Sequence, residues 1–585
     1  MTYELDARKY KKASVCRSGA ARAALCLAAA VLLGVSAPAS GEEFKMLPRP
    51  QYKLYTMCSG KMTLSEEDIS RIARNFEFSH GKFSREQNDA IRKINPNFKC
   101  LTYINSTYTR SVDDVRLAES KYRNGLCMLL AARLAEPIDA GQTRFRVAPP
   151  REEKLAEGKP AAIPIRASTI EGDFSSADAA KPSTKYYVFW IRIGDELMRV
   201  NKFDPAGGEI EVSRGFSASK PAGHKAGDNV FSPVYLGYKR TAGGPAKESM
   251  NDDADDDPGL VDGPPGGSGK EKYPGEHPGG PGSHLRYVLD PSSNDGNLWR
   301  AQQALAAMLE DGVDGVWMDT FNCGTFNLGD CLGRKAHPWN FTRNQAYDFD
   351  DFRLGQEKKV AFIQEFVKAQ LGKYPFLVAN NLHNYEPGRG GMKLLLVPTQ
   401  VKPRPLDGFC MEGGLAIRSL DGWKERIQLL MDAAQNGLAA MPIIGGAGAK
   451  SVLSEPDTPA RDKAERFAYA GYLLAVEKDG KAMMGTYAFY QADGKRFVKV
   501  HPMYYYPIGR PAETVKPDQL DSYLLKGLPV YRRAFTNGLV LVNPSQEACT
   551  VDLGRSYVDP DARKAVTTVA MPAGTGKILL ARLDD

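Results

Sequence analysis

The stretch DGVDGVWMDTF, residues 311–321, indicates the fold of this chain. It follows a segment, 297–310, whose apolar residues recur at helical spacing, and Gly312 and Gly315 mark a turn between the two patterns. The apolar run after this turn predicts a short buried strand that ends in Asp319. Burying a carboxylate is costly, so we expect Asp319 to serve chemistry at the strand end, with capping of the following loop as the alternative.

Strand and helix patterns alternate along much of the remaining chain. Helical spacing recurs over 356–371, 421–436 and 461–476. Eight segments have the nearly continuous apolar character of strands covered on both faces: 52–57, 98–105, 286–290, 315–319, 376–381, 407–412, 438–444 and 482–489. This number of strands, most of them followed by helices, predicts an α/β protein with a (β/α)8 TIM barrel.

Two regions depart from the barrel pattern and predict additional β-domains. Residues 134–236 contain short alternating segments with turn residues, which indicates a small β-domain inserted between the second and third predicted strands. Residues 237–283 are rich in Gly, Pro and Asp and are expected to form a disordered linker. Residues 495–585, with a hairpin signal at Asn537-Gly538, predict a C-terminal antiparallel β-sandwich. The barrel itself is then expected to comprise 45–133 and 284–494.

The first 39 residues have the layout of a secretory signal peptide. A basic segment, 1–22, precedes an apolar segment, 23–37, that is too short to span a bilayer comfortably. Ala37-Pro38-Ala39 supplies small residues for cleavage, and an uncleaved amphipathic anchor is the alternative. Because no later segment is apolar enough to cross a membrane, we expect a secreted or periplasmic protein without stable membrane insertion.

Charge and cysteine content exclude several classes of function. The net charge of +7 is carried partly by the signal region, and the remaining Lys and Arg are dispersed, which argues against nucleic-acid binding. The sequence has no CxxC pair and no Cys/His cluster at zinc spacing, so neither a metal nor a cofactor is expected. Cys323 and Cys331 flank a short loop and could form a disulfide in an oxidising compartment or remain thiols.

The order of these features resembles secreted glycoside hydrolases built on a (β/α)8 barrel. The resemblance rests on DGVWMD at residues 314–319, where the fourth strand ends, and on the terminal pattern NGLVLVNPS, VDLG and MPAGTGKILL. The group is related in pattern to α-galactosidases and endo-polygalactosaminidase-like proteins. The resemblance implies a carbohydrate substrate and a pair of catalytic carboxyl groups.

By the same resemblance, Asp319 matches the position of the nucleophile and Glu412 that of the acid/base. Glu412 ends the sixth predicted strand in DGFCMEGG, where the family more often has Asp. An ion pair with a Lys or Arg of the barrel is the alternative role for Glu412. Trp317, inside the fourth strand, is expected to be core. Further residues expected to bind substrate at the strand ends or in the following loops are Asp290, Asn380, Asn381, Tyr103, His383 and Trp339.

Two other classes of function remain compatible with the sequence. A barrel of this kind can bind carbohydrate without turning it over, because fold alone does not fix function. A structural protein of the cell envelope, in which the β-domains are the important parts, is a further alternative. Paired carboxyl groups and aromatic residues at strand ends favour the hydrolase. The sugar, the linkage and the oligomeric state are not specified by these patterns.

Cleavage of the signal peptide is the first testable prediction. In an exporting host, the mature chain is expected to begin close to residue 40, because the small residues at 37 and 39 suit signal peptidase. N-terminal sequencing of the exported protein tests this. Protein that retains Met1 and stays in the cytoplasm would contradict it.

Overall fold

The structure, a computed structural model, describes residues 44–61, 64–106, 123–150, 165, 190–233, 235–236, 286–319, 321, 338–380, 398–411, 415, 419–442, 459–477, 480–486, 489–492, 495–498 and 500–581. An eight-stranded sheet lies at its centre, in the order β17-β16-β15-β12-β3-β2-β1-β18, with every neighbouring pair parallel. Its strands are β1 (Leu54–Lys61), β2 (Phe78–Lys82), β3 (Lys99–Asn105), β12 (Gly315–Asp319), β15 (Phe376–Ala379), β16 (Gly408–Met411), β17 (Ala439–Pro442) and β18 (Met484–Thr486).

The two edges of this sheet approach one another, so that it is nearly closed. The amide of Met483, just before β18, donates to the carbonyl of Ala440 in β17 at 2.8 Å. Seven of the eight strands contribute to one buried cluster that is separate from the main core: Tyr55, Phe78, Leu101, Trp317, Val378, Cys410, Ala439 and Met441. Because successive side chains of a strand alternate between faces, these residues fill the interior of the barrel. The predicted eight-stranded parallel sheet is therefore present.

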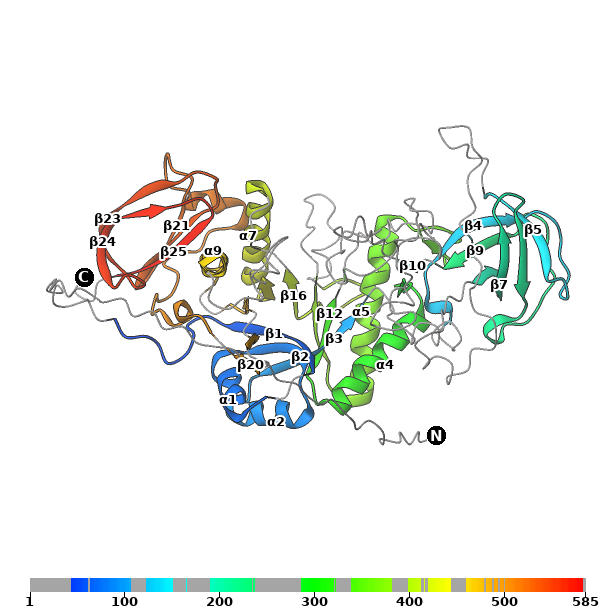
Figure 1. Ribbon diagram of the computed structural model, residues 1–585, viewed down its shortest axis with the longest axis horizontal. Helices are drawn as coiled ribbons and strands as arrows, with labels where there is room; N and C mark the ends of the chain where they lie inside the picture. The colour runs from blue at the N-terminus through cyan, green and yellow to red at the C-terminus, as the bar shows by residue number, and fades with distance from the viewer. Residues whose placement is uncertain are drawn as a thin grey trace, which may run out of the picture. The chain divides into compact units, whose positions relative to one another are not determined.

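Helices cover the outer face of the sheet: α1 (Glu66–Asn75), α2 (Arg85–Ile94), α4 (Asn294–Glu310), α5 (Phe349–Leu371), α7 (Leu420–Gln435) and α9 (Pro459–Ala475). Serine capping boxes start α1 and α2, because Ser65 and Ser84 each accept from the amide three residues later. Gly372 ends α5 at a φ of 71°. Neighbouring pairs, α1 with α2 and α4 with α5, pack against each other (Figure 1). The four helices predicted from apolar spacing correspond to α4, α5, α7 and α9.

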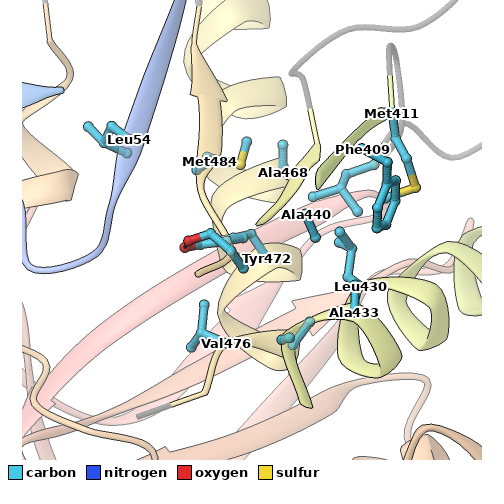
Figure 2. Close-up of a cluster of buried hydrophobic side chains, with 14 of the residues drawn as sticks. Leu54, Phe409, Met411, Leu430, Ala433, Ala440, Ala468, Tyr472, Val476 and Met484 are labelled. Carbon is cyan, nitrogen blue, oxygen red and sulfur yellow. Dashed lines mark hydrogen bonds between the residues drawn. The ribbon is translucent and has the colours of Figure 1, made fainter. Parts of the chain in front are cut away.

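The main hydrophobic core lies between the sheet and these helices. Figure 2 shows Phe409 and Met411 of β16 beside Leu430 and Ala433 of α7. These outward residues alternate with Cys410, which belongs to the interior cluster. Such alternation buries β16 on both faces, which explains why its sequence is apolar without interruption.

Two of the predicted strands need correction. The second barrel strand is β2, with the sequence FSHGK, and it was missed because only one of its five residues is strongly apolar. Residues 286–290 were wrongly assigned to the barrel: β11 (Arg286–Tyr287) pairs antiparallel with β10 (Tyr235–Leu236) in a separate two-stranded sheet. The insertion consequently follows the third barrel strand, and β12 is still the fourth.

The insertion contains a closed six-stranded antiparallel barrel in the order β4-β5-β8-β7-β6-β9. Its strands are β4 (Met128–Leu134), β5 (Arg144–Ala148), β6 (Trp190–Ile193), β7 (Glu196–Asp204), β8 (Glu209–Ser213) and β9 (Asn229–Pro233). Burial would raise the pKa of Glu196, but hydrogen bonds from Arg214, His224 and the Ala222 amide lower this pKa to about 2. A buried carboxylate thus ties together the loops at one end of the small barrel.

The C-terminal part is one five-stranded antiparallel sheet, in the order β21-β22-β25-β23-β24. Its strands are β21 (Tyr531–Phe535), β22 (Gly538–Asn543), β23 (Cys549–Asp559), β24 (Lys564–Met571) and β25 (Thr575–Ala581). Leu541 of β22 shares a buried cluster with Val551 of β23 and Met571 of β24, while Val540 faces the main core. The register of β23 shifts between Asp552 and Tyr557. The antiparallel strands expected here are thus present as a single sheet. Residues of β22, β23 and β24 share one buried cluster.

Four short strands form two further pairs: β13 (Trp339–Asn340) pairs with β14 (Gln345–Ala346), and β19 (Phe489–Ala492) pairs with β20 (Lys495–Val498). None of the helices in the described residues is long and apolar enough to cross a membrane. Residues 1–43 and 237–285, which contain the predicted signal peptide and the whole of the predicted linker, lie outside the described residues.

Arg533 of β21 joins the C-terminal sheet to the barrel. Its side chain is 1% exposed, and its guanidinium donates to the carbonyls of Leu473, Leu474 and Val476 at 2.8–3.0 Å. These carbonyls lie at the C-terminal end of α9, where backbone acceptors have no partner within the helix. A positive charge at this position also opposes the negative end of the helix dipole.

Replacing this guanidinium is expected to destabilise the protein. In Arg533→Met the carbonyls at the end of α9 lose their buried donor, at a cost of about 3 kcal/mol or more. Chemical denaturation of the mature chain measures the loss. Arg532→Met is the matched control, because Arg532 is exposed on the same strand. Equal stability of the two variants would show that Arg533 contributes no more than a surface charge.

Candidate active site

Asp319 is held at the C-terminal end of β12 by donors from both neighbouring strands. Asp319 is only 2% exposed. The hydroxyl of Tyr103, on β3, donates to Oδ2, and Nδ2 of Asn380, just after β15, donates to Oδ1 at 2.8 Å. Both partners are residues that the sequence placed in the substrate site. The structure brings three of the predicted site residues into one contact group.

A second set of contacts fixes the backbone of Asp319. Both the amide and the hydroxyl of Ser106, which follows β3, donate to the Asp319 carbonyl at 2.9 Å. The buried ammonium of Lys359, on α5, donates to the Ser106 carbonyl at 2.9 Å. The end of β12 is thereby linked through β3 to a helix of the outer layer. This support limits the movement of the carboxylate, as catalysis requires of a reacting group.

An aromatic stack lies on the same interior face as Asp319. The ring of His80, on β2, stacks on Trp317 at a centroid distance of 4.1 Å, and Tyr103 lies 5.5 Å from Trp317 on centroids. Trp317 is 1% exposed, which confirms the expectation that it is core. Burial lowers the pKa of His80 to about 3, although the charge of Asp319 opposes this shift. His80 is therefore a neutral ring beside an acidic group at neutral pH.

His80 is a candidate site residue that the sequence did not reveal. Its strand was not recognised, and a single histidine within FSHGK gives no pattern. A usable signal was the capping-box motif SEED at 65–68, which starts a helix and leaves room for a strand before the next serine cap at Ser84. Once β2 is assigned to 78–82, strand alternation puts Phe78 and His80 on the same face.

The barrel interior below the stack is filled by Tyr55. Its hydroxyl lies 3.2 Å from the sulfur of Cys410 and donates to the Met441 carbonyl at 3.3 Å. Gly485 on β18 makes room for this ring, since a Cβ there would lie 2.5 Å from it. The packed interior leaves the C-terminal strand ends as the place where a substrate can reach Asp319.

Asp290 has contacts of a different kind. Its carboxylate accepts from the Tyr347 hydroxyl at 2.7 Å and from the Ser292 amide at 2.9 Å, just before α4 begins. Burial raises the pKa of Asp290, while these hydrogen bonds and the charge of Lys359 oppose the shift. These hydrogen bonds of Asp290 are typical of a turn at the start of a helix. Neither of them connects Asp290 to Asp319.

Trp339, predicted to stack on sugar, lies in the β13–β14 hairpin and is half-buried. Its ring centroid is 5.4 Å from that of Phe231, on β9 of the small barrel. Phe341 also packs on Phe231, at 5.0 Å, and the guanidinium of Arg192 lies over the Phe341 ring at 4.3 Å. Trp339 thus takes part in an aromatic cluster with the inserted domain.

Several predicted residues lie outside the described residues: Glu412, Asn381, His383, Cys323 and Cys331. Their predicted roles stay predictions. Within the described ranges, no group of three or more His, Cys, Asp or Glu side chains is arranged to hold a metal ion. The chemistry available at the described site is therefore that of Asp319, its two donors and the neutral His80.

Comparison with known proteins gives no family for this chain. No protein-family model matches it, and neither does any curated protein sequence. Among solved structures, it is similar to a Paenibacillus sp. cycloisomaltooligosaccharide glucanotransferase complexed with cycloisomaltoheptaose, with 10% identity, a TM-score of 0.27 and coverage of 91% of this chain and 55% of that one. It is also similar to a Tris-bound glucosidase II alpha subunit, with 9% identity, a TM-score of 0.36 and coverage of 91% and 46%. The chain spans about half the length of these structures.

At such TM-scores the two superpositions carry no argument about function. The chain itself forms a nearly closed sheet of eight parallel strands with a buried acid, Asp319, at the end of the fourth.

The depressed pKa of His80 predicts how stability depends on pH. Between about pH 6.5 and pH 3 the unfolded chain binds a proton on this histidine that the folded chain excludes, so acid lowers stability by up to about 1.4 kcal/mol per pH unit. In His80→Phe this contribution is absent while a stacking ring is kept. The Tm of this variant is expected to fall less than that of the wild type between about pH 7 and pH 5. Parallel Tm curves would contradict a neutral buried His80.

Proposed function

We propose that this protein is a glycoside hydrolase that acts on a poly- or oligosaccharide by paired carboxyl chemistry. The observation that carries the proposal is the buried Asp319 at the C-terminal end of the fourth barrel strand, oriented by Tyr103 and Asn380. In (β/α)8 enzymes this end of the strands is where catalytic residues lie. The substrate is a carbohydrate and the site needs no cofactor under this proposal.

Asp319 is proposed to stabilise or attack the anomeric carbon. A sugar ring that loses its leaving group develops positive charge at this carbon, and a carboxylate fixed nearby stabilises that charge. The hydrogen bonds from Tyr103 and Asn380 orient both oxygens of Asp319, so little reorganisation is needed when the charge develops. A fixed carboxylate is also positioned for direct attack on the sugar.

Glu412 is proposed as the general acid/base. Cys410 of β16 faces the barrel interior, as Trp317 of β12 does, and Glu412 follows the end of β16 in the sequence. The acid protonates the leaving oxygen, and the resulting carboxylate then activates water. A separation of about 5–5.5 Å between the two carboxyl groups predicts retention of configuration, and about 6.5–9.5 Å predicts inversion.

His80 and Trp317 belong to the buried core below the site, and we propose that a bridging water links their ring nitrogens to the substrate. Nδ1 of His80 and Nε1 of Trp317 are buried and have no hydrogen-bond partner among the described residues. Buried polar groups normally find partners, so a sugar hydroxyl or a water bridging to one would satisfy them. Of the other predicted binding residues, Asn381, His383 and Trp339 are proposed to line the outer part of the site, whereas the Asp290 carboxylate is engaged by Tyr347 and Ser292.

A carbohydrate-binding protein without turnover is the second candidate, because a site that holds a sugar need not cleave it. The two functions differ in one measurement. A hydrolase releases reducing ends from a polysaccharide panel, whereas a binding protein retains the same polysaccharides unchanged. Export through the predicted signal peptide is part of both proposals, because their substrates lie outside the cell.

Charge-removing substitutions test the catalytic pair. On a polysaccharide that the wild type cleaves, Glu412→Gln is expected to lower kcat by about 10²–10⁴-fold through loss of general acid/base catalysis. Asp319→Asn keeps the shape of the side chain but removes its charge, and we expect a loss at least as large. Asp311→Asn is the control, because Asp311 is exposed at the end of α4. Full activity of either site variant would refute its assignment.

A further inference from the structure

The opposite end of the barrel contains a cavity of about 590 Å³ that the proposed hydrolysis does not use. Small-molecule sites commonly have volumes of about 300–1,000 Å³. Its wall comes from residues at or before the N-terminal ends of the strands, among them Lys53, Lys99, Arg404, Asp407 and Lys481. Because Asp319 lies at the C-terminal end of its strand, the two sites lie at opposite ends of the barrel.

Positive charge dominates the lining of this cavity. Lys481, Lys53 and Lys99 precede or begin β18, β1 and β3, which are close together in the sheet order. Arg404 adds a fourth cation, and Glu77 and Asp407 are the two acids of the lining. Four cations against two acids leave an excess of two positive charges in a concave surface, which concentrates the field.

The acids do not neutralise the lysines one by one. Asp407 accepts from the Leu377 amide at 2.9 Å and from Arg404 at 2.6 Å, so its carboxylate is already engaged. Arg404 is also fixed from the side, because its guanidinium lies 4.8 Å from the centroid of the Tyr374 ring. This pair therefore presents an oriented guanidinium at the wall of the cavity rather than a mobile one.

The three lysines are held only weakly. Nζ of Lys53 donates to the Gly480 carbonyl at 3.3 Å, and Nζ of Lys99 lies 3.7 Å from Asp314. Asp314 is occupied more closely by Arg92, at 2.9 Å. Lys481 makes no hydrogen bond or short ion pair within the part of the chain that the structure describes, but its charge opposes the rise that burial causes in the pKa of Asp407. The ammonium groups are thus available to a ligand without breaking a strong contact.

The floor of the cavity is apolar, with Phe376, Leu406, Leu438 and Met483 between the charged residues. A cationic rim over an apolar floor suits a ligand with an oxyanion group on a compact organic frame. We propose that this N-terminal basin binds a small organic oxyanion, a phosphate monoester or a carboxylate of sugar size, at a site separate from Asp319. Ligand binding here would stabilise the barrel by linking strands from β3 round to β16.

Calorimetric titration of the mature chain tests this basin. The probes are inorganic phosphate, glucose 6-phosphate and glucuronate, with glucose as the uncharged control. Binding of at least one anion, weakened by added salt, and no binding of glucose at this site are expected. Preference for glucose 6-phosphate or for glucuronate identifies which oxyanion the basin accepts.

A double charge reversal locates the site. K53E/K481E places two negative charges at the rim, and anion affinity is expected to fall by at least about tenfold. Lys526 and Lys564 are exposed in the C-terminal part and outside the basin, so K526E/K564E, with the same change of net charge, is the control. Tm measurements without ligand verify that each variant is folded.

The outcomes separate this proposal from the proposed hydrolase. Asp319→Asn should bind the anion with unchanged affinity, because its carboxylate is at the other end of the barrel. Absence of binding by all three anions would refute the basin as an oxyanion site and leave the catalytic proposal untouched. An equal loss in K526E/K564E and K53E/K481E would also refute it, since the effect would then come from net charge alone.

Discussion

A carboxylate removed from water must be solvated by the protein, and the arrangement around Asp319 follows from this constraint. The donors come from Tyr103 on one neighbouring strand and Asn380 after the other. They reach the carboxylate only while β3, β12 and β15 keep their parallel register, in which Asp319 pairs with Asn105. The strand register and the position of the acid therefore depend on each other. A slip by one residue would turn Asp319 toward the helices, where an uncompensated charge is costly.

The same register determines what lies inside the barrel. Gly315, at the start of β12, has no room for a side chain, because a Cβ there would lie 2.0 Å from the Phe376 carbonyl. Two residues on, Trp317 fills the interior, and His80 stacks on it. A neutral histidine can be buried here at lower cost than a charged one, and its low pKa is the consequence of that burial. The interior below Asp319 is in this way both packed and uncharged.

Charge is distributed differently at the two ends of the barrel. At the C-terminal end Asp319 is almost fully buried, whereas at the N-terminal end cations surround an open cavity. The additional β-domains are stabilised by their own buried charges: Glu196 joins the loops of the small barrel, and Arg533 joins the terminal sheet to α9. In each case a charged group is buried only where several hydrogen bonds compensate it.

The sequence by itself determined the elements whose patterns are local. Apolar spacing predicted α4, α5, α7 and α9, and the run that ends in Asp319 predicted β12, because both periodicities follow from backbone geometry. Only the tertiary structure decided which strands join the barrel: FSHGK is a barrel strand because its neighbours supply the apolar surroundings, and 286–290 is not, because β10 pairs with it instead. The tertiary structure likewise decided that His80 lies near Asp319, whereas Asp290 accepts hydrogen bonds at the start of a helix. Such partnerships join residues far apart in the chain, and no local pattern contains them.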